Sequence, residues 1–169
     1  KQPVAIGEIG IDLYWQQDNL AVQTEAFRAQ LDLARELGVP AVIHMREADD
    51  AMLETLESHG ALPNIHFHSF DGGAGMRTWA LEHQATIGVG GLLTRKGSED
   101  LRQWVADLDR SRVVLETDSP YLKPRGIRGT RNQPAFMVRT AKVLAELWST
   151  DLESVATVTT KNAERIFGV

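Results

Sequence analysis

Apolar positions along this chain follow two alternating patterns, short strand-like runs and longer stretches with helical spacing. In the first long stretch, apolar residues recur every three or four positions, and Gly38 follows as a suitable C-terminal stop. The predicted strands lie at 3–10, 40–45, 64–70, 85–91 and 111–118. The predicted helices lie at 18–38, 46–60, 72–84, 97–110, 132–148 and 151–167. Ser98 is the predicted N-cap of the fourth helix.

The regular alternation of strand and helix predicts an α/β fold whose parallel strands are joined by right-handed crossovers. The spacing between strands is about one βα unit, which suits a barrel or a doubly wound sheet. At 169 residues, the chain is long enough for one domain with a substantial core. It contains neither a GxGxxG sequence nor a P-loop, so no nucleotide cofactor is indicated.

Composition narrows the class of protein. The apolar fraction of 43% and the charged fraction of 24% are typical of a soluble globular protein. The absence of cysteine excludes disulfides and thiolate metal sites and fits a reducing compartment, so we expect a cytoplasmic protein. The net charge of −5 argues against a general nucleic-acid binder but allows a local basic site. No apolar run approaches the roughly 20 residues of a membrane span, so no membrane partner is expected.

Ligand-type side chains recur at the ends of the predicted strands. Glu8 ends the first run, His44 the second, His68 lies near the end of the third, and Asp118 closes the fifth. Because the carboxyl ends of parallel strands share one edge, these side chains are expected to converge there. Oxygen and nitrogen ligands without sulfur suit Zn, Mn, Fe, Ni or Mg. Taken singly, each has an ordinary alternative, such as a helix N-cap, turn chemistry or a hydrogen-bonded core histidine.

Six motifs in order resemble the TatD family of metal-dependent deoxyribonucleases over essentially the whole chain. They are GEIGID, PAVIHMREA, HSF, LETDSPYL, RGTRNQP and the terminal TTKNAERIFG. The resemblance implies a TIM barrel that uses two divalent metal ions, Mg, Mn or Zn, to cut phosphodiester bonds in DNA. It implies that Glu8, His44, His68 and Asp118 are metal ligands, with Glu8 able to bridge two metals and Asp118 acting as the catalytic base.

His66 lies two residues before His68, and neighbouring positions of this kind on a strand point to the same face. In the family pattern the third-strand histidine precedes a small residue and a phenylalanine, as His68 precedes Ser69 and Phe70. The resemblance therefore makes His68 the ligand and His66 a neighbour one layer deeper in the barrel.

The resemblance begins at the fourth strand of the family barrel, so we expect residues 1–169 to be a single domain truncated at its N-terminus. About five βα units cannot close an eight-stranded barrel, which typically takes about 250 residues. The expectation is an incomplete barrel with open edge strands, which lacks one metal's histidine pair. Upstream coding sequence with a His-x-His motif would test it.

Basic residues follow the fourth and fifth predicted strands, and they are Arg95, Lys96, Lys123, Arg125, Arg128 and Arg131. Arginine can hold a phosphate through two parallel hydrogen bonds, so these residues are candidates for contacts to DNA. The alternative is a solvated basic loop without a ligand. Two other functions stay open: hydrolysis of a different ester or amide, such as aminoacyl-tRNA deacylation, and a non-catalytic fragment or assembly partner. The sequence leaves the oligomeric state open.

Overall fold

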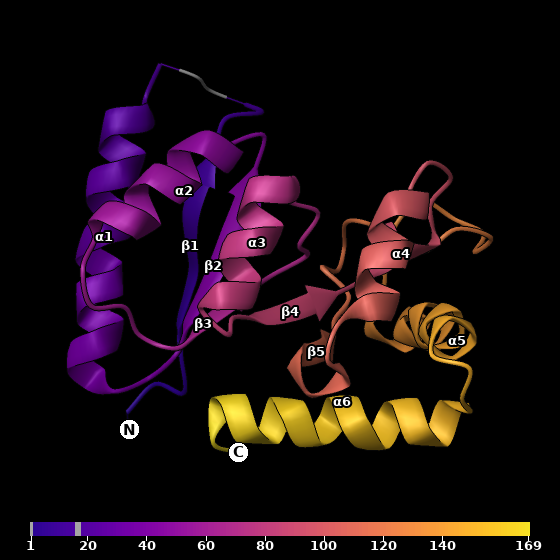
Figure 1. Ribbon diagram of the computed structural model, residues 1–169. Helices are drawn as coiled ribbons and strands as arrows, with labels where there is room; N and C mark the ends of the chain where they lie inside the picture. The colour runs from indigo at the N-terminus through magenta and orange to yellow at the C-terminus, as the bar shows by residue number, and fades with distance from the viewer. Residues whose placement is uncertain (1, 16–17) are drawn as a thin grey trace. The chain divides into compact units, whose positions relative to one another are not determined.

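The computed structural model describes residues 2–15 and 18–169. Within these residues, five strands alternate with helices, as the sequence predicts (Figure 1). The strands are β1 (Ile6–Asp12), β2 (Ala41–Arg46), β3 (Ile65–Phe67), β4 (Thr86–Val89) and β5 (Val113–Leu115). The helices are α1 (Leu20–Leu37), α2 (Asp49–Ser58), α3 (Ala74–Glu82), α4 (Glu99–Asp107), α5 (Met137–Leu147) and α6 (Leu152–Phe167). Short 3-10 helices lie at Gly91–Thr94, Arg110–Arg112 and Pro134–Phe136.

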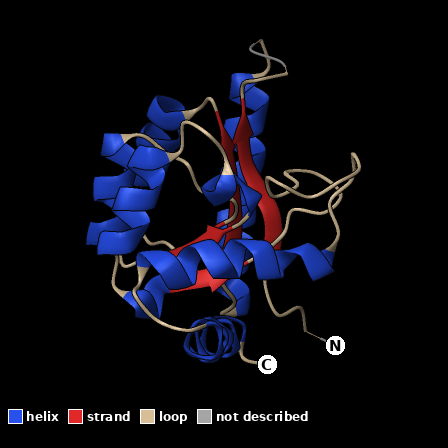
Figure 2. Cartoon of the chain, turned by 90° about the vertical axis from the view of Figure 1, so that its right-hand side faces the viewer, coloured by secondary structure: helices blue, strands red, loops and turns tan. Residues whose placement is uncertain are grey.

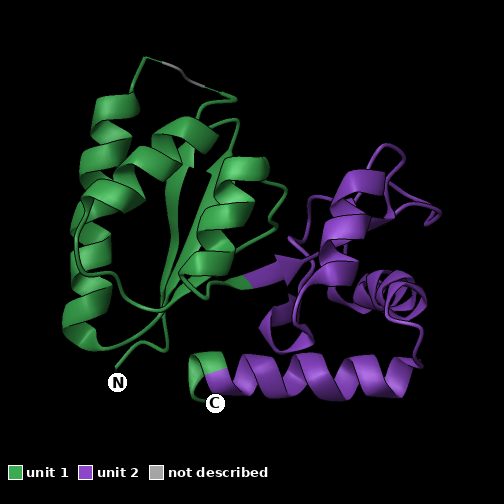
Figure 3. Ribbon diagram, viewed as in Figure 1, with its two compact units in different colours: residues 1–86, 166–169 green, residues 87–165 purple. Residues whose placement is uncertain are grey.

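The chain divides into two compact units, residues 1–86 with 166–169, and residues 87–165 (Figure 3). In the first unit β1 pairs with β2, and β2 with β3, in parallel. In the second unit β4 pairs with β5, also in parallel. The predicted α/β fold with parallel strands is therefore confirmed.

The first unit is built on the long neighbouring strands β1 and β2, which run side by side (Figure 2). Buried residues alternate with more exposed ones along β2 and the second half of β1, and Ile11 and Ile43 are fully buried. Helix α1 covers the sheet with Phe27 and Leu31 on its buried face. This alternation leaves the other side chains of β1 and β2 free to form a polar site.

The second unit has its own apolar core. Leu101 and Val105 of α4, Leu144 of α5 and Val155 of α6 are buried, together with Val113 of β5. Ser98 is the N-cap residue of α4, as predicted, although its side chain makes no cap hydrogen bond. The acidic residues of the first turn supply favourable charge at this end of the helix instead.

Side-chain amide and guanidinium groups of helix α6 donate hydrogen bonds to backbone oxygens of the second unit. The buried Asn162 donates from Nδ2 to the backbone oxygens of Arg110 and Val113, both at 2.8 Å. Arg165 donates to the backbone oxygen of Ser111 at 2.6 Å. Part of the terminal motif therefore has a structural function. Among the described helices, none combines the length and the apolar character needed to cross a bilayer.

Candidate metal site

Glu8, His44 and His68 converge in the first unit, with ligand atoms that all lie within 4.8 Å of one another. The Oε1 atom of Glu8 lies 3.5 Å from Nδ1 of His44, and its Oε2 atom lies 3.4 Å from Nε2 of His68. The two imidazole rings are roughly parallel, with centroids 6.4 Å apart. One carboxylate and two imidazoles that face a common point form a donor set that suits a divalent metal ion.

The strands place these three side chains by their pairing. Gly10 lies opposite His44 in the β1–β2 register, which is irregular between Gly7 and Ile9. A Cβ atom at Gly10 would lie 1.9 Å from the backbone oxygen of His44, and its φ of +147° favours glycine. The absence of a side chain at position 10 therefore lets β1 approach the strand that carries His44.

Strand β1 extends further than expected. We predicted a first strand at residues 3–10 with Glu8 near its end, but β1 continues to Asp12, which is paired with Arg46 at the end of β2. The predicted strand stopped at Gly10, two residues early, although Ile11 continues the alternation of buried residues along β1. The extension places Asp12 beside His44.

Asp12 is a candidate site residue that sequence reasoning missed. Its Oδ2 atom lies 3.1 Å from Nε2 of His44, and its Oδ1 atom accepts a hydrogen bond from the backbone N–H of Tyr14 at 2.9 Å. A carboxylate on one imidazole nitrogen fixes the tautomer and leaves the other nitrogen available to a metal. The signal in the sequence was the spacing Glu8–Gly10–Asp12, because alternate strand residues share a face.

Gln23 holds the backbone of Asp12 in place. Its side chain accepts from the N–H of Asp12 at 2.8 Å and donates to the carbonyl oxygen of Asp12 at 3.0 Å. Asn19 accepts a further bond from Gln23 at 2.6 Å. Asp12 is therefore positioned from both its backbone and its side chain.

His66 occupies a different environment from His68. It is buried, its Nδ1 atom lies 3.0 Å from the hydroxyl of Thr86, and its ring packs edge-on against Phe167. The Thr86 hydroxyl donates in turn to the backbone oxygen of Ile65 at 3.2 Å. Among the described residues, the metal-ligand cluster contains His68 and not His66. The ligand role of His68 stays a prediction.

Asp118 and the basic candidates belong to the second unit. Asp118 follows β5 with a φ of +52°, and its ligand and base roles stay predictions of the family resemblance. The buried Asn132 supports this segment with two hydrogen bonds. Its side-chain amide donates to the carbonyl oxygen of Thr117, and its backbone N–H donates to the carbonyl oxygen of Pro120. The RGTRNQP motif therefore contains a residue that shapes the Asp118 loop.

The second unit also brings its two basic loops together. The backbone N–H of Arg125 donates to the hydroxyl of Thr94 at 2.7 Å. A Cβ atom at Gly91 would lie 1.8 Å from the backbone oxygen of Leu122, so the loops contact each other closely. The candidate basic residues on these loops are exposed, and they are Arg95, Lys96, Arg125, Arg128 and Arg131. This local cluster is compatible with phosphate binding, which stays a prediction.

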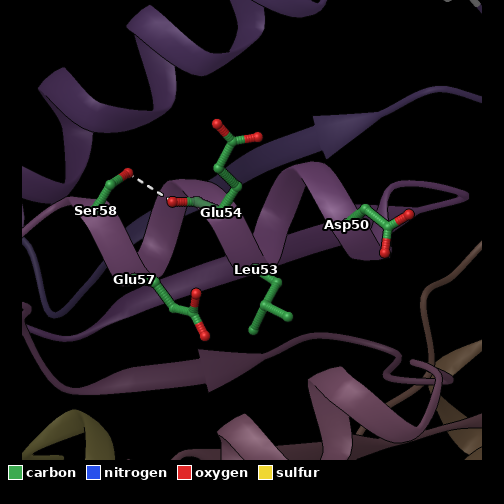
Figure 4. A pocket seen from close by; sticks show the side chains of 5 residues that line it. All are labelled: Asp50, Leu53, Glu54, Glu57 and Ser58. Atoms are coloured by element: carbon green, nitrogen blue, oxygen red, sulfur yellow. Dashed lines mark hydrogen bonds between the residues drawn. The ribbon is translucent and has the colours of Figure 1, made fainter.

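A shallow hollow along α2 is a poor alternative site. Its lining residues are Asp50, Leu53, Glu54, Glu57 and Ser58 (Figure 4). The Ser58 hydroxyl donates within the helix to the backbone oxygen of Glu54 at 2.5 Å. Three carboxylates there would repel a phosphodiester, and the hollow includes none of the predicted site residues.

Burial and neighbouring charges shift the pKa of Asp71, which lies three residues after His68. Partial burial, aided by the charge of Asp49, raises the pKa of Asp71, while Arg46 and Arg77 act in the opposite direction. The Asp49 carboxylate also accepts the backbone N–H of Gly73.

Comparisons with known proteins agree with the motifs. Residues 1–168 match the sequence profile of the family described as TatD related DNase. The uncharacterized metal-dependent hydrolase YabD of Bacillus subtilis is 34% identical over 168 residues, which are 98% of this chain and 66% of YabD. The 3'-5' ssDNA/RNA exonuclease TatD of Erwinia amylovora is 35% identical over 175 residues, which cover 98% of this chain and 66% of that exonuclease.

The fold agrees with a solved structure of similar sequence. The crystal structure of YjjV, a TatD homolog from Escherichia coli, superimposes with a TM-score of 0.88 at 30% identity. The match covers 98% of this chain and 64% of YjjV. The chain thus spans slightly less than two thirds of the length of the curated relatives it matches.

Proposed function

This chain belongs to the TatD family of metal-dependent hydrolases, and from that membership we propose that it hydrolyses phosphodiester bonds in DNA with a bound divalent metal ion. The observation that carries the proposal is the convergence of Glu8, His44 and His68, whose ligand atoms lie within 4.8 Å of one another. The name of the Erwinia amylovora relative, a single-stranded DNA and RNA exonuclease, makes single strands the first substrates to test.

The donor chemistry fits the metal. The Asp12 carboxylate accepts from Nε2–H of His44, so the lone pair of His44 remains on Nδ1, the atom that faces Glu8. His68 presents Nε2 to the same carboxylate. A divalent ion held by these groups would supply electrostatic activation of water and of the phosphoryl oxygens. The half-exposed Glu8 side chain leaves the site open to a substrate, since its exposed fraction is 51%.

The chain's own residues would provide the remaining functions. Asp118 is proposed as the general base that accepts the proton of the attacking water. Arg125, Arg128 and Arg131, with Arg95 and Lys96, would hold the negatively charged backbone of the substrate. Phosphate contacts of this kind give affinity without sequence preference.

The test is degradation of labelled single-stranded DNA with Mg, Mn or Zn, with and without a chelator. Both the 169-residue chain and a form extended by the expected N-terminal βα units are assayed, together with aminoacyl-tRNA as a second substrate. We expect metal-dependent cleavage of DNA by the extended form, abolished by Glu8→Gln and retained by the surface variant Asp32→Asn. A protein that leaves DNA intact with every metal but deacylates aminoacyl-tRNA would contradict the proposal.

A further inference from the structure

Two aromatic side chains lie exposed immediately beyond the candidate metal site. Tyr14 and Trp15 follow the end of β1, with exposed fractions of 46% and 75%. Their rings meet edge-to-face with centroids 4.7 Å apart. Single exposed aromatic residues are common on protein surfaces. This pair differs because it contacts an arginine and, through the backbone of Tyr14, the Asp12 carboxylate that supports the candidate ligand His44.

Arg46, the last residue of β2, covers one face of the pair. Its guanidinium carbon lies 3.5 Å from the centroid of Tyr14 and 5.7 Å from that of Trp15. The backbone oxygen of Arg46 accepts from the N–H of Leu13 at 3.0 Å, so the aromatic segment is attached to the end of β2. Arg46 stacks on Tyr14, and the indole of Trp15 keeps most of its surface open to solvent.

The platform of Tyr14, Trp15 and Arg46 is coupled to the metal site through Asp12. One oxygen of Asp12 contacts His44, and the other accepts from the backbone of Tyr14. His44 and Arg46 are two residues apart on β2, so their side chains leave the same face about 6.6 Å apart along the strand. A group on the platform would therefore lie beside a phosphate held at the metal site.

We infer that Trp15, supported by Tyr14 and Arg46, is a stacking site for an unpaired nucleobase adjacent to the phosphodiester that is cut. This inference rests on the proposed nuclease function and adds a substrate-binding site to it. An open indole face offers sequence-tolerant stacking, since every base has a π-face, and Arg46 adds positive charge beside the phosphate backbone. Bases within a duplex are already stacked, so the platform favours single strands.

The closing experiment measures binding without turnover. Anisotropy of a labelled oligodeoxythymidine is titrated with the chain in chelator at fixed salt, beside an abasic oligonucleotide of the same length and charge. We expect the base-containing strand to bind more tightly, and Trp15→Ala to lose about tenfold in affinity for it, in line with the loss of one stacked base. The variant should bind the abasic strand as the unmodified chain does. Trp15→Phe should retain most of the affinity.

Leu33→Ala is the matched control, because Leu33 is an exposed apolar residue on α1 and lies outside the platform. Circular dichroism checks that each variant is folded. An oligoribouridine should show the same loss with Trp15→Ala as the DNA does, because stacking reads the base and not the sugar. If Trp15→Ala binds the oligonucleotide as tightly as Leu33→Ala, or if the unmodified chain binds both strands equally, the stacking site is refuted.

Binding in chelator separates this inference from the proposed activity. A chain that binds thymidine strands through Trp15 but cuts no DNA with any divalent metal contradicts the nuclease proposal and supports the stacking site. If the unmodified chain and the Trp15→Ala variant cut DNA equally well, the nuclease proposal is supported and the stacking site is contradicted.

Discussion

Replacing Asp12 tests whether the geometry of the candidate site controls metal affinity. The change Asp12→Ala removes the carboxylate that lies 3.1 Å from Nε2 of His44, without removing any of the three clustered ligands. His44 would then be free to rotate and to change its tautomer. We therefore expect weaker binding of the metal with the same number of bound ions.

The structure also indicates the size of the effect. Loss of a residue that supports a metal ligand typically costs about 10- to 100-fold in metal affinity. The side chains of His44 and Asp12 keep 30% and 26% of their surface exposed, so water can replace part of the lost hydrogen bond. We accordingly expect the lower end, about tenfold, or about 1.4 kcal/mol of binding free energy.

Asp12→Asn refines this test. An asparagine can still accept one hydrogen bond through its carbonyl oxygen, but its amino group would face the second donor. Because Asp12 serves both His44 and the N–H of Tyr14, only one of these bonds can persist. The expected loss in affinity is therefore smaller than for Asp12→Ala.

Isothermal titration with Mn²⁺ and Zn²⁺ measures these affinities, with circular dichroism as the check on folding. Asp32→Asn is the control, since Asp32 pairs with Arg35 on the surface of α1. Folded Asp12→Ala that binds Mn²⁺ as tightly as the control would refute the positioning role of Asp12. Unchanged binding by His44→Ala would refute the site itself.

Three further outcomes follow from the structure. His68→Ala should abolish Mn²⁺ binding in calorimetry, whereas His66→Ala should retain it but lower the thermal midpoint, because His66 is buried against Phe167. In filter binding and nuclease assays, Asp118→Asn should bind DNA normally without cutting it, and Arg131→Ala should weaken binding and reduce the salt slope by about one. Asn162→Ala should destabilise the fold by about 2 kcal/mol, since two backbone oxygens lose their donor, and calorimetry should show a fall of about 6 °C.

The fold was largely predictable because the apolar pattern is simple. Strands β2 and β5 contain short apolar runs and the helices have apolar residues at regular spacing, so element type and order follow directly. Boundaries were less predictable. The third predicted strand spans residues 64–70, but only Ile65–Phe67 form β3, because His68 and the following residues turn away toward α3.

The candidate site was predictable where it depends on strand order and less so where it depends on pairing. Glu8, His44 and His68 could be chosen because they lie at or near the ends of apolar runs. The contact of Asp12 with His44 depends on how far β1 pairs with β2, which involves residues 34 positions apart between Asp12 and Arg46. Apolar periodicity contains no information on that register. The exposed Trp15 was missed for a related reason, since its neighbour Arg46 comes from the other strand.

Gly10 shows how a position without a side chain can determine the geometry of ligands. It lies opposite His44, and the close approach of the two backbones there leaves no room for a Cβ atom. Glu8 and Asp12 flank Gly10 on β1, and each directs a carboxylate to a different nitrogen of the same imidazole. This spacing therefore places His44 between two carboxylates, the candidate ligand Glu8 and the supporting residue Asp12. In this arrangement one strand supplies both the charge that attracts a metal and the contact that orients its histidine.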